Sequence, residues 1–186
     1  MVHVCAAAPS PWVRRFASLI RLHGRVLDLA AGNGRHTALL RDRGFSVVAA
    51  DRDTAALGAF AGDPACAIRT IDLEDGGPWA LGGSYDGIVV ANYLHRPLFP
   101  SLIDALALGG ILIYETFAVG NGRFGRPSNP EFLLRPGELL AVFGSALSVV
   151  AFEQGVVEAP KPAVIQRIAA AKTAQPLALP SAADAS

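Results

Sequence analysis

One stretch of the chain indicates its fold more clearly than any other: Val26-Leu27-Asp28-Leu29-Ala30-Ala31-Gly32-Asn33-Gly34-Arg35-His36-Thr37. Its apolar first half predicts a buried strand, and its last residues predict the start of a helix. Glycine has no Cβ, so the turn between them can adopt unusual dihedral angles and let a ligand approach closely. The turn therefore indicates either a ligand-binding loop or a plain strand-to-helix connection, because short glycine patterns occur in both.

The rest of the chain alternates strands with helices. We expect helices over 12–22, 35–43, 54–60, 100–108 and 136–143, and strands over 25–30, 45–50, 65–71, 85–91, 110–117, 147–157 and 162–169. Such alternation is typical of βαβ units, which build a parallel sheet with helices on both faces. The connection between the last two strands is too short for a helical crossover, so these strands must pair antiparallel. The sequence thus predicts a doubly wound α/β sheet that ends in an antiparallel hairpin.

Length and composition limit the class of protein. The 186 residues suit one domain, which we place at 1–172, before a disordered tail at 173–186. Sixteen Lys and Arg balance sixteen Asp and Glu, which argues against nucleic acid or an anionic membrane as partner. The sequence has no apolar run of about 18 residues and no N-terminal signal pattern. With Cys5 and Cys66 as two reduced thiols, we expect a cytoplasmic protein; nothing in the sequence indicates its oligomeric state.

An acid precedes the glycines and helps to separate two possible ligands. A dinucleotide fingerprint would need a third glycine where this chain has Thr37, and Asp28 would face the pyrophosphate. A carboxylate at the end of the first strand suits a cationic group instead, such as the amino group of a methionine moiety beside a sulfonium. The alternative role for Asp28 is that of a carboxylate that braces the loop or caps the helix.

Two further acids end the next two strands. Asp51 ends the second strand, where a carboxylate can accept both ribose hydroxyls of a nucleoside. Asp72 ends the third strand and could accept the exocyclic amine of adenine, with Leu73 packed on the ring. Asp53 is expected to cap the helix that begins at Thr54. Acids at three successive strand ends favour a nucleoside site over isolated turn residues.

These motifs resemble those of class I S-adenosylmethionine-dependent methyltransferases, and most of all those of small bacterial methyltransferase-domain or tellurite-resistance-like proteins. The resemblance extends over 10–170 and rests on the segments 28–34, 48–52, 71–74, 92–97, 114–117 and 125–130. It implies a three-layer Rossmann-like methyltransferase fold, with a mostly parallel seven-stranded sheet, and S-adenosylmethionine as the cofactor. The cofactor-binding residues that it implies are Asp28, Ala30, Gly32, Gly34, Asp51, Arg52, Asp72, Leu73 and Asn92.

One residue of the glycine loop departs from the family pattern. The family often has glycine where this chain has Ala30. Alanine is tolerated at such a position if its φ is negative. The change weakens the motif slightly and does not overturn it.

Catalysis would take place at the ends of the fourth and fifth strands. Methyl transfer depends mainly on positioning, and a general base is needed only if the acceptor must lose a proton. The candidates are Tyr93, His95 and Glu115. Each has a structural alternative: His95 could be a loop hydrogen-bonding residue, and Glu115 could pair with Arg96 or Arg126. His36 is expected to face solvent.

The irregular segment 118–136 is longer than ordinary loops, which is typical of a lid or binding loop. Arg96, Arg126 and Asn129 are the candidate substrate-binding residues, and the arginines of the loop hint at an anionic acceptor. Because the chain carries no appended substrate domain, a small molecule is the expected substrate. Two other hypotheses remain: an NAD-dependent oxidoreductase, and a cofactor-binding relative without catalysis.

Overall fold

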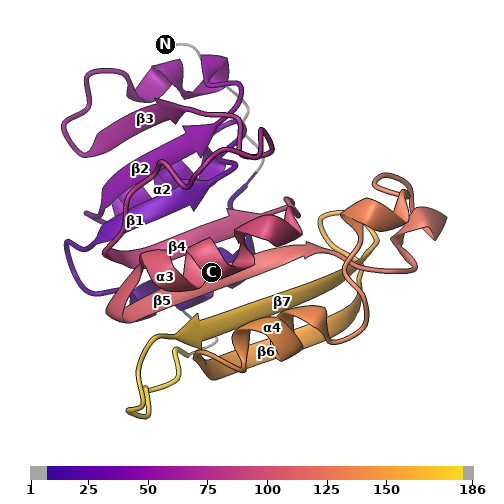
Figure 1. Ribbon diagram of the computed structural model, residues 1–186. Coiled ribbons are helices and arrows are strands. Elements are labelled where there is room, and N and C mark those ends of the chain that lie inside the picture. The colour runs from indigo at the N-terminus through magenta and orange to yellow at the C-terminus, as the bar shows by residue number, and fades with distance from the viewer. Residues whose placement is uncertain (1–7, 182–186) are drawn as a thin grey trace.

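The computed structural model describes residues 8–181, and within them seven strands form a single sheet in the order β3-β2-β1-β4-β5-β7-β6 (Figure 1). The strands are β1 (Arg25–Leu29), β2 (Ser46–Asp51), β3 (Cys66–Thr70), β4 (Tyr85–Ala91), β5 (Leu106–Phe117), β6 (Ser148–Val157) and β7 (Ala163–Ala171). The first five pair in parallel, whereas β7 pairs antiparallel with both β5 and β6. This topology confirms the predicted Rossmann-like α/β fold with its terminal hairpin.

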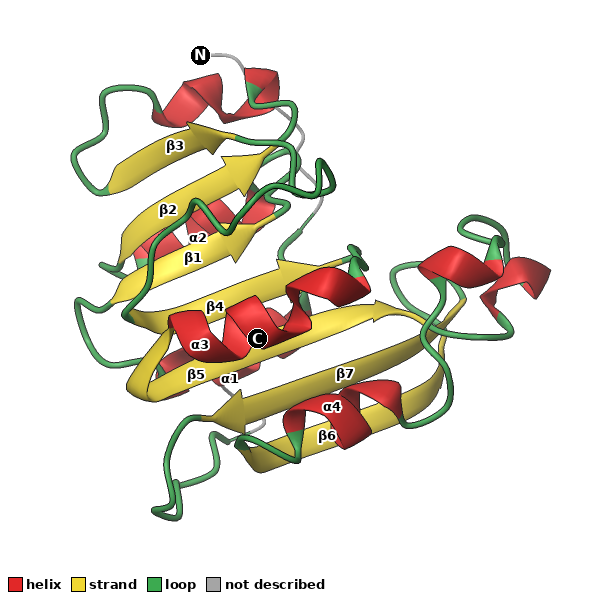
Figure 2. Ribbon diagram, viewed as in Figure 1, coloured by secondary structure: helices red, strands yellow, loops and turns green. Residues whose placement is uncertain are grey.

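Helices cover both faces of the sheet (Figure 2). The α-helices are α1 (Pro11–Phe16), α2 (Arg35–Asp42), α3 (Phe99–Ala105) and α4 (Glu138–Phe143), and the short 3-10 helices are η1 (Ala17–Leu19), η2 (Ala55–Phe60), η3 (Arg96–Leu98), η4 (Asn121–Arg123) and η5 (Pro130–Phe132). Trp12, Phe16 and Leu40 bring α1 and α2 into one apolar core, and Phe99, Leu102 and Phe143 bring α3 and α4 into the other. The two cores explain why the strands read as continuous apolar runs.

The fifth strand shows how the sheet contributes to both cores. Ile111 and Ile113 belong to the core under α1 and α2, whereas Leu112 and Tyr114 belong to the core under α3 and α4. Successive side chains of a strand point to opposite faces, so this alternation follows from the pleat. The same alternation places each later residue of β5 on one face of the sheet or the other.

Several helix boundaries differ from the sequence prediction. The helix expected over 12–22 ends at Phe16 and continues as η1 to Leu19, and the helix expected over 54–60 is a 3-10 helix. The helix expected over 100–108 ends at Ala105, and β5 begins at Leu106. Lys172, far along the chain, donates from Nζ to the carbonyl oxygens of Ile103 (2.8 Å) and Leu106 (2.9 Å) and so satisfies the helix end.

The ends of the chain leave some predictions without a test. Residues 172–181 contain no helix or strand, and Cys5 lies outside the described residues. Cys66 is a free thiol in β3. The single domain at 1–172 and the disorder of the tail stay predictions. Over residues 8–181, no helix has the length and apolar character that a membrane crossing requires.

Candidate functional site

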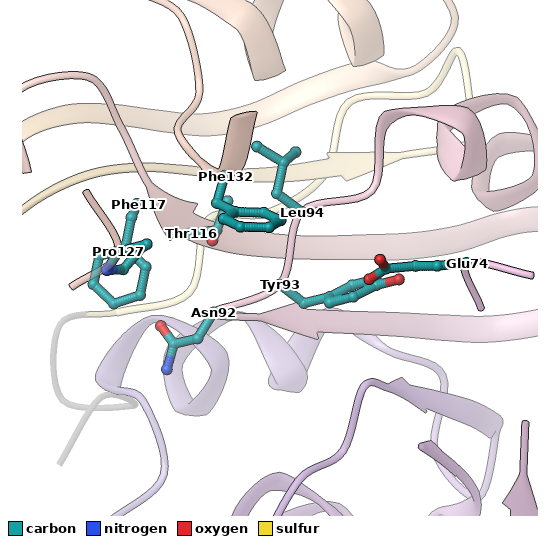
Figure 3. A pocket seen from close by; sticks show the side chains of 8 residues that line it. All are labelled: Glu74, Asn92, Tyr93, Leu94, Thr116, Phe117, Pro127 and Phe132. Carbon is teal, nitrogen blue, oxygen red and sulfur yellow. The ribbon is translucent and has the colours of Figure 1, made fainter. Parts of the chain in front are cut away.

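Two adjoining cavities lie at the edge of the sheet where the parallel strands end. We call the first the carboxylate cavity; it measures about 250 Å³ and is lined by Ala30, Asp51, Arg52, Ile71, Asp72, Leu73, Glu74 and Tyr93. We call the second the aromatic cavity; it measures about 270 Å³ and is lined by Glu74, Asn92, Tyr93, Leu94, Thr116, Phe117, Pro127 and Phe132 (Figure 3). Glu74 and Tyr93 belong to both walls, so the two cavities meet there.

The glycine turn leads from β1 into α2 and faces this edge. Gly32 has φ +55°, and a Cβ placed on it would meet nothing within 4 Å, so its outer side is open. Gly34 has φ +76°, and a Cβ there would lie 2.5 Å from Cε2 of Phe60 and 2.9 Å from Cδ2 of Leu57. Gly34 is therefore needed for packing against η2, whereas Gly32 presents bare backbone toward the site.

Ala30 does not meet the condition under which alanine is tolerated in the loop. Its φ is +55°, not negative. The chain must leave β1 sharply here, because the next amide, that of Ala31, donates to the carbonyl of Ala50 in β2 (3.0 Å). Alanine in the left-handed region is strained by roughly 1–2 kcal/mol.

This strain makes a stability prediction. We expect Ala30→Gly to raise the free energy of unfolding by about 0.5–1 kcal/mol, since relief of strain exceeds the added entropy of the unfolded chain. Urea denaturation followed by circular dichroism measures the change. The matched control is Ala31→Gly, because Ala31 does not have a positive φ. Glycine at this position should lower the free energy of unfolding. An equal decrease in the free energy of unfolding in both variants would contradict backbone strain at Ala30.

Asp51 ties the glycine turn to the end of β2. Its Oδ2 accepts the N–H of Gly32 (2.8 Å), and its Oδ1 accepts the N–H of Asp53 (3.0 Å). As predicted, Asp53 caps the next turn, accepting the N–H of Ala55 (3.0 Å). Asp51 therefore lines the carboxylate cavity and also fixes the loop beside it. Its contact with a ribose stays a prediction.

Asp72 occupies the corresponding position after β3. Its Oδ1 accepts the N–H of Glu74 (2.9 Å), which turns the chain and brings Glu74 to the junction of the two cavities. Leu73 and Ile71 supply apolar surface on the same wall. A carboxylate and apolar side chains thus share this wall, and their contact with adenine stays a prediction.

Asp28 lies beneath the loop and lines neither cavity. Its carboxylate is 1% exposed and accepts a hydrogen bond from Oγ1 of Thr37 (2.6 Å). Burial raises the pKa of Asp28 to about 6, although the Thr37 hydrogen bond acts in the opposite direction. The structure thus shows the loop-bracing role, and contact of Asp28 with a ligand stays a prediction.

The raised pKa of Asp28 gives a pH-dependent prediction. A carboxyl group whose pKa is raised by folding stabilises the protein most below its unfolded pKa of about 4, and this contribution is lost as the pH rises through 6. Asp28→Asn keeps an oxygen for Thr37 but never carries the charge. We expect the free energy of unfolding of the variant, relative to that of the wild type, to rise between pH 4 and 7 by on the order of 2 kcal/mol. Urea denaturation at four pH values tests this, and a difference independent of pH would contradict it.

His36, expected to face solvent, is buried instead. It is 3% exposed, and its Nε2 accepts the backbone N–H of Ser10 (3.1 Å). Burial lowers the pKa of His36 to about 3, so the ring is a neutral acceptor at neutral pH. His36 therefore fastens the segment before α1 onto the start of α2.

Of the three catalytic candidates, only Tyr93 lines the cavities. Its buried hydroxyl lies beside the carboxylate of Glu74, which can accept its hydrogen, and no other described residue is its partner. Burial raises the pKa of Tyr93, and the carboxylate of Glu74 raises it further. Tyr93 therefore stays protonated at neutral pH and acts as a hydrogen-bond donor rather than a base. Figure 3 shows the Glu74 carboxylate beside the hydroxyl end of its ring.

The other two candidates lie elsewhere. His95 precedes η3 and is absent from both cavity walls. Glu115 follows Tyr114 on β5 and so points to the opposite face of the sheet, where Ser10 and Arg167 lie near it. Burial raises the pKa of Glu115. Neither residue lines the aromatic cavity, and a catalytic role for either stays a prediction.

Arg96 holds the loop in this structure, and its contact with a substrate stays a prediction. Its Nε and Nη2 donate to both carboxylate oxygens of Glu138 (2.6 and 2.9 Å). Nη1 donates to the carbonyl of Glu131 (2.9 Å), and Nη2 also donates to the carbonyl of Leu133 (2.9 Å). Arg96 thus pairs with Glu138 and not with Glu115, which was one of the two partners considered for Glu115. The bidentate ion pair and the two carbonyl contacts hold the guanidinium between the loop and α4.

The other two predicted substrate residues are also outside the cavity walls. Asn129 caps η5 by accepting the N–H of Glu131 (3.1 Å), and Arg126 is exposed. Their neighbours Pro127 and Phe132 line the aromatic cavity instead. The loop therefore contributes to the site as predicted, but through apolar rather than polar side chains.

Comparison with solved structures relates this arrangement to known folds. No protein-family model matches the sequence, and neither does any curated protein. TehB from Haemophilus influenzae is similar at a TM-score of 0.67, with 18% identity over 84% of this chain and 60% of TehB. A SAM-dependent methyltransferase from Methanosarcina mazei is similar at 0.67, with 13% identity over 91% of this chain and 100% of that one. The chain has the fold of S-adenosylmethionine-dependent methyltransferases.

A third structure with this methyltransferase fold contains two bound molecules. It is 1,6-didemethyltoxoflavin-N1-methyltransferase from Burkholderia thailandensis, solved with 1,6-didemethyltoxoflavin and S-adenosylhomocysteine. Its TM-score is 0.64, with 19% identity over 88% of this chain and 76% of that one. At these identities the likeness establishes the fold, and the function must be argued from the site.

Sequence reasoning missed most of the aromatic cavity. It did not single out Glu74, Leu94, Thr116, Pro127 or Phe132, which line the wall. Pro127 and Glu74 lay within motifs shared with the methyltransferases, which was the available signal. Phe132 lay outside those motifs, and only the folded loop brings it to the site.

Proposed function

We propose that this chain binds S-adenosylmethionine in the carboxylate cavity and transfers its methyl group to a small molecule in the aromatic cavity. One observation carries the proposal: a cavity with carboxylates at two strand ends lies next to a second, apolar cavity, and Glu74 and Tyr93 belong to the walls of both. A cofactor and an acceptor need such adjoining sites, because methyl transfer requires the two to meet in line.

The residues present fit the cofactor. Asp51 would accept the ribose hydroxyls and Asp72 the adenine amine, with Leu73 against the ring. The open side of Gly32 leaves room for the methionine moiety. When bound, S-adenosylmethionine supplies a positively charged, electrophilic methyl group, which a cavity rich in carboxylates favours.

The same features disfavour a nicotinamide dinucleotide. The third position of its glycine fingerprint is Thr37, whose hydroxyl is bonded to the buried Asp28 (2.6 Å). A pyrophosphate at this turn would lie close to the carboxylates of Asp28 and Asp51, and like charges repel. Among residues 8–181, Arg52 is the one counter-charge on the wall of the carboxylate cavity.

Two residues at the junction would act on the acceptor. Tyr93 stays protonated at neutral pH and would donate a hydrogen bond from its buried hydroxyl. Glu74 offers a carboxylate that can accept an N–H or O–H. Together they would orient the acceptor atom toward the carboxylate cavity.

A turnover assay tests the proposal. The full chain is incubated with S-adenosylmethionine and a broad panel of small acceptors, and release of S-adenosylhomocysteine is measured by mass spectrometry. We expect release with some acceptors and its loss in Asp51→Ala. A chain that binds S-adenosylhomocysteine but releases none with any acceptor would contradict methyl transfer.

A further inference from the structure

We infer that the aromatic cavity is selective for small aromatic amines over aromatic anions, with Glu74 accepting the amine N–H. This inference rests on the proposed function, because it names the class of acceptor for the same site. It reverses the anionic acceptor that the arginines of the loop had suggested.

The walls of the aromatic cavity suit a flat apolar ring. Leu94, Phe117, Pro127 and Phe132 surround most of it (Figure 3). Phe132 is 51% exposed, so much of its ring faces water. A ring bound beside it would remove this apolar surface from water, which favours binding. The volume of about 270 Å³ limits the ligand to a small molecule.

The charge of the cavity opposes an anion. Glu74 is the single ionisable acid on this wall, and no Arg, Lys or His stands with it among the described residues. Arg96 is committed to Glu138 and to the carbonyls of the loop. The guanidinium of Arg123 lies over the ring of Phe124, 4.6 Å from its centroid. A carboxylate or phosphate entering the cavity would therefore meet an acid without a compensating cation.

The polar groups at the junction match an amine on a ring. The Tyr93 hydroxyl is a buried donor beside the Glu74 carboxylate, and no other described residue is its partner. A ring nitrogen or oxygen could accept from Tyr93 while an adjacent N–H donates to Glu74, so one end of the ligand would satisfy both residues.

The loop that completes the cavity is fixed before any ligand arrives. Asn121 is 2% exposed, donates from Nδ2 to the carbonyl of Pro127 (3.0 Å) and accepts the N–H of Val164 in β7 (3.1 Å). Arg96 holds the carbonyls on either side of Phe132. Pro127 and Phe132 are thus held from opposite ends, and a preformed cavity loses little entropy on binding.

The test uses two probes that share a benzimidazole ring, one with an amino group and one with a carboxylate. The full chain without cofactor is titrated by calorimetry or ligand-observed NMR with 2-aminobenzimidazole and with benzimidazole-2-carboxylate. We expect the amine to bind at least tenfold more tightly. Glu74→Gln should reduce this preference at least tenfold, and Phe132→Ala should weaken binding of the amine. Glu158→Gln, an exposed acid on the turn between β6 and β7, is the control and should change nothing.

The outcomes separate this inference from the proposed function. Equal or tighter binding of the carboxylate, or a preference unaffected by Glu74→Gln, would overturn the inference. Failure of both probes to bind a chain that binds S-adenosylhomocysteine would overturn it while leaving the proposed function intact. Failure of S-adenosylhomocysteine itself to bind would instead count against the proposed function.

Discussion

Gly34→Ala should lower the free energy of unfolding by about 2–5 kcal/mol, more than the substitution of the other glycine in the loop, Gly32. Two effects add. The residue has φ +76°, which strains alanine by roughly 1–2 kcal/mol, and its Cβ would lie 2.5 Å from the Phe60 ring. Phe60 and Leu57 are buried, so relieving this overlap would cost a further 1–3 kcal/mol or so. Urea denaturation followed by circular dichroism measures the loss.

The matched control for this prediction is Gly32→Ala. Gly32 has φ +55° but open space where its Cβ would be, so only the backbone strain applies. We expect a loss of about 1–2 kcal/mol in stability. The added methyl group would face the site, so this variant should lose more affinity for S-adenosylhomocysteine than its stability loss suggests. Equal destabilisation by the two substitutions would contradict the different roles of the two glycines.

Asp51→Ala should weaken binding of S-adenosylhomocysteine about 100-fold. The substitution removes the carboxylate proposed to bind the ribose, worth about 1.5–3 kcal/mol as a charged hydrogen-bonding partner. It also leaves the N–H groups of Gly32 and Asp53 without their acceptor, which loosens the loop. Isothermal titration calorimetry measures the affinity.

The control for Asp51 is its neighbour Asp53. Asp53→Ala removes only the hydrogen bond to the Ala55 N–H and should leave the affinity within about twofold. Asp51→Asn is also expected to weaken binding, because an amide has a single oxygen and cannot accept both N–H groups. Unchanged affinity in Asp51→Ala would remove Asp51 from the cofactor site.

The fold was predictable because its signals are local. The apolar run before Gly32 and the short link before Ala163 indicate a parallel sheet that ends in a hairpin, and both follow from periodicity and loop length. Asp51 and Asp72 were predictable for the same reason, since the carboxyl ends of parallel strands meet at one edge.

The errors arose where distant segments meet. Arg96 was assigned to the substrate because its ion-pair partner, Glu138, lies 42 residues later in the chain. Glu115 was assigned to the site from its position at the end of β5, but the pleat turns it to the opposite face. The φ of Ala30 depends on the hydrogen bond that Ala31 makes to β2. The residues that flank each of these positions in the sequence do not indicate such long-range contacts.

Calorimetric titration of the full chain with S-adenosylhomocysteine and with NAD tests the central claim most directly. The carboxylates at the strand ends, the bonded Thr37 and the open side of Gly32 predict that S-adenosylhomocysteine binds at one site per chain and that NAD gives no measurable heat. Binding of NAD without binding of S-adenosylhomocysteine would contradict the account.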